Sequence, residues 1–348
     1  MASIQNYRQL PSGMHVATQE AASEQLKGLK KTIHEVKPYL PRDGEALVFD
    51  FCWEKKLPLM CVGPPGSAKT TFLQFMSAYH NVPFVRIPFF EGSTISSVRG
   101  TPMIWTGPAG EKHMVFRDGP VSTAVRSGEA VIYLDEVRKA GGDILSFFYP
   151  MADYDRRFIN EATTESIPLS DKVMLAASYN PGQLFGSTEL EPAFARRFVT
   201  LTFDYLDTRN LAKVALERTG ASGESGSNEI LNLFRKRMLD GKKALQANKP
   251  KAVARKEEIA TGFADGVRIV RDAASNGQFT LKEVPGDSAV ITALHMVLEG
   301  FDYVTATLAA IVNPVLSDLD SRRKQTQEAI TQAITARLPN IPELKRKP

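Results

Sequence analysis

The segment Gly63-Pro-Pro-Gly-Ser-Ala-Lys-Thr70, "GPPGSAKT", decides the fold of this chain. It follows a short apolar run, "LPLMCV" (57–62), and precedes a stretch whose apolar residues recur at helical spacing (72–76). A buried strand, a glycine-rich turn and a helix in this order can cradle phosphate groups, because the backbone N–H groups of the turn point inward at the positive end of the helix. The spacing matches the pattern GxxxxGK[ST], except that Ala68 stands where the pattern has glycine.

This loop predicts a site for ATP. We expect Lys69 to reach the β- and γ-phosphates and Thr70 to bind Mg²⁺ through its hydroxyl group. Ala68 lies close to the start of the helix, where we expect helical φ and ψ angles that suit alanine as well as glycine. The alternative, a purely structural turn, is disfavoured by the strand before the loop and the helix after it. The residues expected to contact the nucleotide are Gly63, Pro64, Pro65, Gly66, Ser67, Ala68, Lys69, Thr70 and Thr71.

Polar residues follow two further apolar runs. In "VIYLDE" (131–136), Asp135 and Glu136 end a predicted strand, and ligands of α/β sheets bind at such strand ends. We expect Asp135 to hold the metal through its water shell and Glu136 to orient and deprotonate the attacking water. In "VMLAASYNPG" (173–182), Asn180 ends another strand and can hydrogen-bond the γ-phosphate or the water. The alternatives are an acidic helix cap for the first pair and a turn-forming asparagine before Pro181 for the second.

Two adjacent arginines, Arg196 and Arg197, end the segment "LEPAFARRF" (190–198) just before the last apolar run. In isolation such a pair is as often surface charge. It would act on a nucleotide only if the nucleotide of a neighbouring subunit lay against it, and an arginine supplied in this way accelerates phosphoryl transfer by about 10³–10⁵.

Apolar runs at 83–90, 131–134, 173–178 and 198–203 alternate with helix-length segments, which predicts a doubly wound α/β fold with a parallel sheet. Three parts follow: a loosely held arm (1–43) with one helix near 17–36, an α/β core (44–205) and a helical region (206–348) that begins with a flexible joint at 222–227. The helices expected in and around the core and in the helical region cover 44–56, 208–219, 228–247, 256–275, 287–311 and 316–337.

The composition of the chain disfavours several classes of function. Hydrophobic residues make up 43% and charged residues 24% of the chain, and the net charge is +4, so a nucleic-acid partner is disfavoured. No apolar run approaches the roughly 20 residues of a membrane span, and the N-terminus lacks the layout of a signal peptide. Cys52 and Cys61 lie among apolar neighbours, which indicates reduced thiols and a cytoplasmic protein. The five histidines have no spacing suited to a metal site.

The order of loop lysine, strand-end Asp-Glu, strand-end Asn and arginines before a final strand resembles that of AAA+ ATPases. More narrowly, the chain resembles the MoxR group and its NorQ/CbbQ branch, through "LPLMCVGPPGSAKTTF", "FRDGPVSTAVRSGEAVIYLDEV", "SYNPG" and "RRFVTLTFDY". The likeness covers about residues 38–205, just under half of the chain. An Ala-Lys-Thr ending of the loop is itself common in MoxR-type proteins.

The resemblance implies a homohexameric ring with ATP between subunits, a helical lid after the core, and two inserted hairpins at about 101–117 and 153–172. It also implies a partner with a von Willebrand factor A domain and remodelling of a client enzyme, such as Rubisco or nitric oxide reductase. By motif match it assigns the site roles given above to Lys69, Thr70, Asp135, Glu136 and Asn180. Arg197, which directly precedes Phe198, is the expected arginine finger, with Arg196 second.

The chain departs from the family pattern in the lid. Arg268 and Arg271 are available to sense the nucleotide, but Gly262 stands where an arginine is expected. Three functions stay open: an ATPase that remodels a client, a subunit of a metal chelatase, and a nucleotide-gated scaffold with little hydrolysis. Glu136 argues against the scaffold, because a pure binder needs no base at that position.

Overall fold

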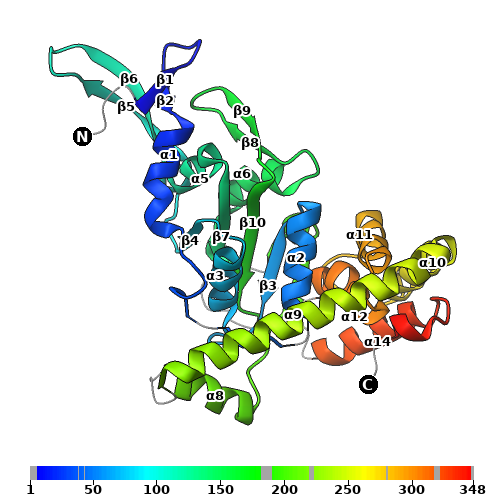
Figure 1. The fold of residues 1–348 in the computed structure, drawn as a ribbon. Helices are drawn as coiled ribbons and strands as arrows, with labels where there is room; N and C mark the ends of the chain where they lie inside the picture. Colours follow the sequence, from blue (N-terminus) through cyan, green and yellow to red (C-terminus); the bar gives the residue numbers. More distant parts are fainter. Residues whose placement is uncertain are drawn as a thin grey trace.

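A five-stranded parallel sheet forms the centre of the computed structural model, which describes residues 6–37, 39–42, 44–181, 190–218, 223–279, 281–316 and 322–345 (Figure 1). All neighbouring strands run in the same direction. In spatial order the strands are β11 (Val199–Thr202), β3 (Leu59–Val62), β10 (Lys172–Tyr179), β7 (Glu129–Asp135) and β4 (Phe84–Pro88). The α/β class expected from the sequence is confirmed, and each strand lies within one of the expected apolar runs or overlaps it closely.

Helices cover both faces of this sheet, which explains why the strands β3, β7 and β10 are apolar runs without alternation. The edge strand β4 alternates between buried and exposed residues. On one face, α2 (Glu45–Lys55) and α3 (Lys69–Tyr79) bury a cluster that contains Phe49 and Phe72. On the other face, α5 (Pro120–Ser127), α6 (Gly142–Ala152) and α7 (Pro192–Ala195) enclose a second cluster, which contains Val121, Phe148 and Phe194. The α/β core therefore has three layers, with the sheet between two layers of helices.

The helical region packs onto the first of these layers. Phe263 and Ile330 belong to the same contiguous apolar cluster as Phe49, so the region shares a core with the sheet. The expected joint at 222–227 is wrong in part: Ser222 lies outside the described residues, and a long helix begins at Gly223. The helices of this region are α8 (Thr208–Arg218), α9 (Gly223–Ala254), α10 (Lys256–Ser275), α11 (Asp287–Leu298), α12 (Tyr303–Thr307), α13 (Asn313–Val315) and α14 (Arg323–Thr335).

Two hairpins are inserted into the α/β core, as the resemblance implied. The first consists of β5 (Gly100–Thr106) and β6 (Lys112–Asp118) and follows the short helix α4 (Ile95–Arg99); it projects from the body in Figure 1. The second consists of β8 (Arg157–Asn160) and β9 (Glu165–Pro168). Both are antiparallel and end in polar turns.

The N-terminal arm is tied to the core, contrary to the loosely held arm expected. Its strands β1 (Tyr7–Gln9) and β2 (His15–Ala17) extend the sheet of the first hairpin, in the order β1-β2-β6-β5. Its helix α1 (Gln19–Leu26) packs against α5. The helix begins where the Thr18 side chain accepts the N–H of Ala21, and it is much shorter than the expected 17–36.

A buried ion network joins the arm to both hairpins. The guanidinium of Arg126 in α5, only 3% exposed, contacts Asp118 of β6 at 3.0 Å and Glu165 of β9 at 2.5 Å, and Arg8 of β1 contacts Glu165 at 2.7 Å. Burial raises the pKa of Asp118 to about 6 in spite of Arg126. Burial acts in the same direction on Glu165, but hydrogen bonds from Arg126 outweigh it and lower the pKa of that carboxyl.

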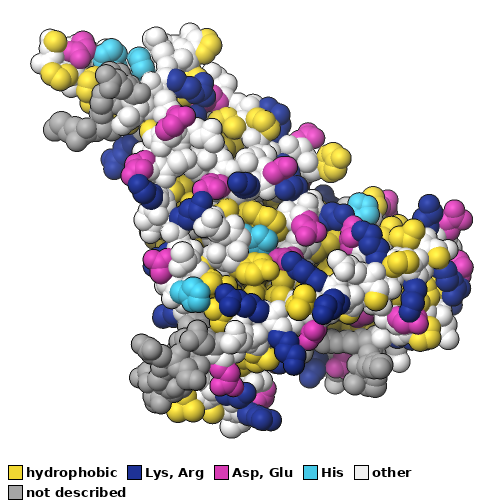
Figure 2. All heavy atoms as spheres, in the orientation of Figure 1, with side chains coloured by type: hydrophobic (Ala, Val, Ile, Leu, Met, Phe, Trp, Pro, Cys, Tyr) yellow, Lys and Arg dark blue, Asp and Glu magenta, His cyan; other side chains and the backbone are white. Residues whose placement is uncertain are grey.

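The surface in view mixes charges of both signs, with apolar side chains between them (Figure 2). Over this face there is no continuous basic stripe of the kind that follows a nucleic-acid backbone. Within the described ranges, none of the helices is long and apolar enough to cross a membrane.

Candidate nucleotide-binding site

The carboxyl ends of three neighbouring strands bring the expected site residues together. Gly63 directly follows β3, Asp135 ends β7, and Asn180 directly follows β10. Because these strands are parallel and adjacent, their ends meet at one edge of the sheet, and α3 begins there at Lys69. The edge therefore collects a helix N-terminus, a lysine, a carboxylate and an amide.

The loop encloses its own lysine. Lys69 is 8% exposed, and its Nζ donates to the carbonyl oxygens of Gly63 (2.7 Å) and Pro64 (2.9 Å) and to Oδ1 of Asn180 (2.8 Å). Burial lowers the pKa of Lys69, against the effect of nearby acidic groups that include Glu136 and Asp135. The ammonium group is thereby held at a fixed place under the loop, where a phosphate group can replace one of its carbonyl partners.

Ala68 does not have the helical angles expected from the sequence. Its φ and ψ are 69° and 21°, in the left-handed region, like Gly66 with a φ of 79°. The chain has to turn sharply between the loop and the first residue of α3, and this left-handed position is where the usual pattern has glycine. An L-residue costs about 1–2 kcal/mol there. The Ala68 methyl group is partly buried against the apolar cluster of α2 and α3.

Asn180 connects the lysine to the expected catalytic carboxylate. Its Oδ1 accepts from Lys69, and its Nδ2 donates to Oε1 of Glu136 at 2.5 Å. Glu136 itself has a φ of 55°, so the chain leaves β7 through a left-handed residue. The three side chains form one continuous line of hydrogen bonds from the loop to the end of β7.

Thr70 and Asp135, the two residues expected at the metal, are linked by a tyrosine that the sequence reasoning passed over. The Tyr133 hydroxyl lies 3.0 Å from Thr70 Oγ1, donates to Asp135 Oδ1 at 2.7 Å, and lies 2.6 Å from Ser178 Oγ. Ser178 also donates to Asp135 Oδ1, at 3.0 Å. The signal was available: Tyr133 and Asp135 are two apart on a strand and share one face.

The second oxygen of Asp135 is held by Arg86, which was also missed. Arg86 lies on β4, and its Nε and Nη2 donate to Asp135 Oδ2 at 2.8 and 2.5 Å. Its side chain is 53% exposed, whereas that of Asp135 is 10% exposed. A charged residue in the otherwise apolar run "FVRIP" was the only hint in the sequence.

The donor set suits Mg²⁺. This ion prefers oxygen ligands, keeps several waters, and is usually held by one or two protein groups together with phosphate oxygens of the substrate. Thr70 and Asp135 offer a hydroxyl and a carboxylate of this kind. In the part of the chain that the structure describes, no group of three or more histidine, cysteine or acidic side chains could hold a metal without a substrate.

A pocket of about 190 Å³ opens beside the loop, with mostly apolar walls and one cation. Arg42 borders it and donates to the backbone carbonyls of Ser67 (2.8 Å) and Asp204 (2.6 Å), so it ties the loop to the chain after β11. The position of the pocket next to the loop suits the base of a nucleotide. The lining residues are Tyr39, Leu40, Arg42, Gly66, Ala68, Tyr205, Leu206, Leu211 and Val214.

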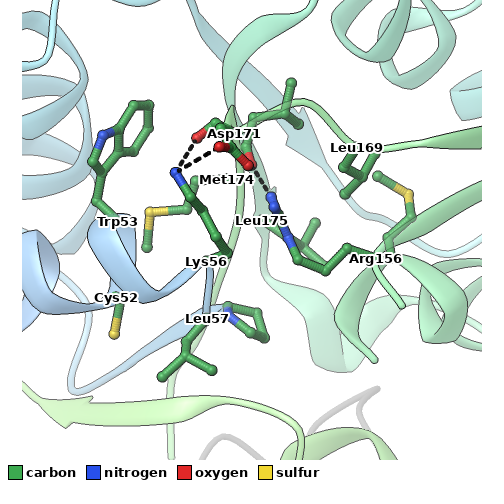
Figure 3. A pocket seen from close by; sticks show the side chains of 12 residues that line it. Cys52, Trp53, Lys56, Leu57, Arg156, Leu169, Asp171, Met174 and Leu175 are labelled. Carbon is green, nitrogen blue, oxygen red and sulfur yellow. Dashed lines mark hydrogen bonds and ion pairs between the residues drawn. The ribbon is translucent and has the colours of Figure 1, made fainter. Parts of the chain in front are cut away.

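A second hollow, bordered by α2 and β10, is too small for a ligand (Figure 3). Its volume is about 10 Å³, close to the least that holds one water molecule. Lys56 and Arg156 reach across it to the backbone of Asp171 and Val173. The polar groups there fasten the start of β10 and offer no site.

The expected finger residues do not join the loop of their own chain. Arg197, at the end of α7, pairs with Asp153 at 2.5 Å and lies over the Tyr149 ring at 4.4 Å. Arg196 pairs with Glu283 at 2.8 Å. Their side chains are 21% and 50% exposed.

The lid arginines also lie apart from the loop contacts. Arg268 pairs with Asp265 at 3.5 Å and Arg271 with Asp287 at 2.7 Å. Gly262 is where α10 touches the segment that follows α14: a Cβ there would lie 2.7 Å from the carbonyl oxygen of Arg337, so an arginine does not fit. The helical region does reach the site strand through Lys282, which donates to the Tyr179 hydroxyl at 3.2 Å.

Together, the parallel strand order, the loop after β3 and the acidic pair after β7 define a nucleotide-binding protein of the phosphate-loop class. Residues 58–198 match the family model described as AAA domain (dynein-related subfamily), and the chain belongs to this family of ATPases. The resemblance to the MoxR group and its NorQ/CbbQ branch is confirmed by the relatives that the chain matches.

The denitrification regulatory protein NirQ of Pseudomonas aeruginosa is 32% identical over 200 residues, which cover 57% of this chain and 72% of that protein. Protein NorQ of Paracoccus denitrificans is 32% identical over 183 residues, which cover 52% of this chain and 65% of that protein. Protein CbbQ of Hydrogenophilus thermoluteolus is 25% identical over 205 residues, which cover 59% of this chain and 74% of that protein. A solved structure from Cytophaga hutchinsonii, named as a candidate ATPase, has a TM-score of 0.58 over 92% of this chain and 96% of its own; at 15% identity it supports the fold alone.

Proposed function

We propose that this protein is a ring-forming, Mg²⁺-dependent ATPase that uses hydrolysis to remodel or activate a client protein. The observation that carries the proposal is the line of hydrogen bonds from Lys69 through Asn180 to Glu136. It places a phosphate-binding cation, a neutral amide and a carboxylate base within one continuous contact path, which is the arrangement that attack of water on a γ-phosphate requires.

Each side chain has a role that follows from its chemistry. The loop, Gly63 to Thr71, binds the phosphates through its backbone N–H groups, and Lys69 contributes the charge. Asn180 orients the γ-phosphate or the water, and Glu136 takes a proton from that water. Thr70 and Asp135 hold Mg²⁺, which neutralises phosphate charge when bound. The base of the nucleotide occupies the pocket between Tyr39 and Val214.

Ring formation would complete the site. Arg197, with Arg196 as the second candidate, is proposed to reach the nucleotide of an adjacent subunit in a homohexamer. Both arginines directly follow α7 and have partners other than the loop of their own chain, which supports a role at the nucleotide of a neighbouring subunit. The helical region, 206–348, acts as the lid of the core, and the arm, 1–43, supports its hairpins.

The proposed partner and client are inferred from the relatives to which the chain is similar. Membership alongside NirQ, NorQ and CbbQ supports a partner with a von Willebrand factor A domain and a client enzyme, such as a metalloenzyme. The two cysteines are free and buried, which supports a reducing compartment and a cytoplasmic protein. A chelatase-type subunit shares the architecture, and no observation in the structure favours it.

Phosphate release tests the hydrolytic role. We expect Glu136→Gln to bind ATP as the wild type does and to release phosphate at least about 100-fold more slowly, because the base is lost. Glu161→Gln, at the exposed turn of the second hairpin, is the matched control and should behave as the wild type. Equal rates for the wild type and Glu136→Gln would leave the nucleotide-gated scaffold as the better description.

Mixing two inactive variants tests the shared site. Glu136→Gln keeps both arginines, and the double variant Arg196→Ala/Arg197→Ala keeps the base. If sites lie between subunits, mixed rings contain some sites with both groups intact, and activity returns on mixing. Activity that stays absent after mixing, or a wild-type rate per subunit that is independent of dilution, contradicts the ring.

A further inference from the structure

Tyr133 is a buried aromatic residue whose hydroxyl group the packing does not require. The residue is fully buried in the cluster of α2 and α3, and its ring stacks on Phe84 with centroids 5.5 Å apart and an angle of 26° between the planes. A phenylalanine would fill the same space and keep the same stacking. A buried hydroxyl is costly unless it is hydrogen-bonded, so its partners indicate its use.

The hydroxyl meets groups from three elements. Thr70 comes from the first turn of α3, Asp135 from the end of β7, and Ser178 from β10. A tyrosine hydroxyl has one proton and two acceptor sites. Its proton goes to Asp135, which can only accept when ionised, so it is left to accept the proton of Thr70.

This assignment has a consequence for Thr70. When its proton points at Tyr133, the lone pairs of Thr70 Oγ1 point elsewhere and are available to a cation at the loop. Ser178 acts on the other side, because it donates to the same oxygen of Asp135 as Tyr133 does. Ser178 has one proton, which goes either to this oxygen or to the Tyr133 hydroxyl 2.6 Å away, and in both cases it braces the hydrogen bond from Tyr133 to Asp135. The orientation of the carboxylate is thereby set before any ligand arrives.

We propose that Tyr133, assisted by Ser178, is a positioning residue for magnesium: its hydroxyl group orients Thr70 and Asp135 so that their oxygens face the ion together. This inference rests on the proposed ATPase function and deepens it. Outer groups of this kind typically change metal affinity 10–100-fold when removed.

The test is the Mg²⁺ dependence of nucleotide binding, measured on the full-length protein with a fluorescent ATP analogue. Tyr133→Phe is expected to raise the half-saturating Mg²⁺ concentration about tenfold or more. Binding of the analogue in EDTA should not change, because Tyr133 contacts neither Lys69 nor the backbone N–H groups of the loop. The matched control is Tyr303→Phe: the Tyr303 hydroxyl in α12 is buried and has no hydrogen-bond partner among the described residues.

A merely structural tyrosine gives a different result. Tyr133→Phe would then change the unfolding midpoint and leave the half-saturating Mg²⁺ concentration as in the wild type, and this outcome overturns the proposal. An equal loss of binding in EDTA overturns it too. If Tyr133→Phe does not fold, Ser178→Ala keeps the tyrosine and should raise the half-saturating concentration about threefold; an unchanged value decides against the proposal. Failure of the wild type to bind nucleotide would instead contradict the proposed function itself.

Discussion

Arg86 and Asp135 form an ion pair across two neighbouring parallel strands, with both Nε and Nη2 of the arginine on Oδ2 of the carboxylate. The other oxygen, Oδ1, belongs to Tyr133 and Ser178. The two oxygens of Asp135 thus have different partners: buried hydroxyl groups on one side, and an arginine that is 53% exposed on the other. A cation that binds Asp135 has to share the carboxylate with that arginine.

We therefore expect Arg86→Gln to lower the half-saturating Mg²⁺ concentration for nucleotide binding. An ion pair with a half-exposed arginine is worth up to about 1 kcal/mol, so the change should not exceed about fivefold. Arg255→Gln, which removes an exposed arginine paired with Glu258 in the helical region, is the control. A rise in the Mg²⁺ requirement would show that Arg86 holds Asp135 in place and does not compete with the ion.

Ala68→Gly should stabilise the protein. Glycine relieves the left-handed strain, about 1–2 kcal/mol, but it makes the unfolded chain more flexible by about 0.4–1 kcal/mol. The net gain in the free energy of unfolding is about 0.5–1 kcal/mol, measured by urea denaturation. Gly66→Ala at a φ of 79° reverses the argument and should destabilise. Two variants with effects of the same sign would contradict the strain at position 68.

Asp118 makes the stability depend on pH in the direction opposite to that of most carboxylates. Its folded-state pKa is about 6, against an ordinary value of 3.8, so between these values the folded protein holds a proton that the unfolded chain has lost. Stability therefore falls as pH rises from about 4 to 6, by about 3 kcal/mol from this group alone.

Asp118→Asn removes the titrating group, and the difference between its unfolding free energy and that of the wild type isolates the effect. We expect the free energy of unfolding of the variant, relative to that of the wild type, to rise by about 2–3 kcal/mol from pH 4 to pH 7. Urea titrations at both pH values measure this gain. If the unfolding free energies of the two proteins change equally with pH, Arg126 keeps Asp118 ionised throughout this range.

Gly262→Ala tests the close contact of α10 with the segment that follows α14. The added Cβ would lie 2.7 Å from a backbone oxygen of Arg337, so this segment has to move away from α10. Overpacking costs about 1–3 kcal/mol, of which alanine's helix propensity returns about 1, so a net loss of about 1–2 kcal/mol is expected in thermal unfolding. Gly142→Ala, in the first turn of α6 with open space around it, should cause no loss.

The strands and the loop could be predicted because their signals are local. Each core strand is an apolar run that ends in a glycine, an acid or an asparagine, and such runs are read without knowing the fold. The same holds for Lys69, Asp135 and Asn180, whose places at strand ends bring them together once the sheet is parallel. Tyr133 was within reach of the same reasoning and was passed over because a tyrosine in an apolar strand resembles core.

What could not be predicted depends on contacts between distant segments. Arg86 meets Asp135 only because β4 lies next to β7, which the chain order does not state. The helix expected at 17–36 is too long, because α1 ends at Leu26 and the chain continues in a tighter turn at Lys27–Leu29. The angles of Ala68 depend on the path from β3 to α3, which no local propensity describes.

The pairing of β2 with β6 bears on how the protein can be handled. A shortened chain that starts after Ala17 would lose β1 and β2 and leave the edge of β6 open, with Arg8 no longer on Glu165. Open strand edges recruit other strands, so such a chain would stick to copies of itself. In size-exclusion chromatography such aggregates could be mistaken for assembled rings. The number of subunits should therefore be measured on chains with an intact amino-terminal segment.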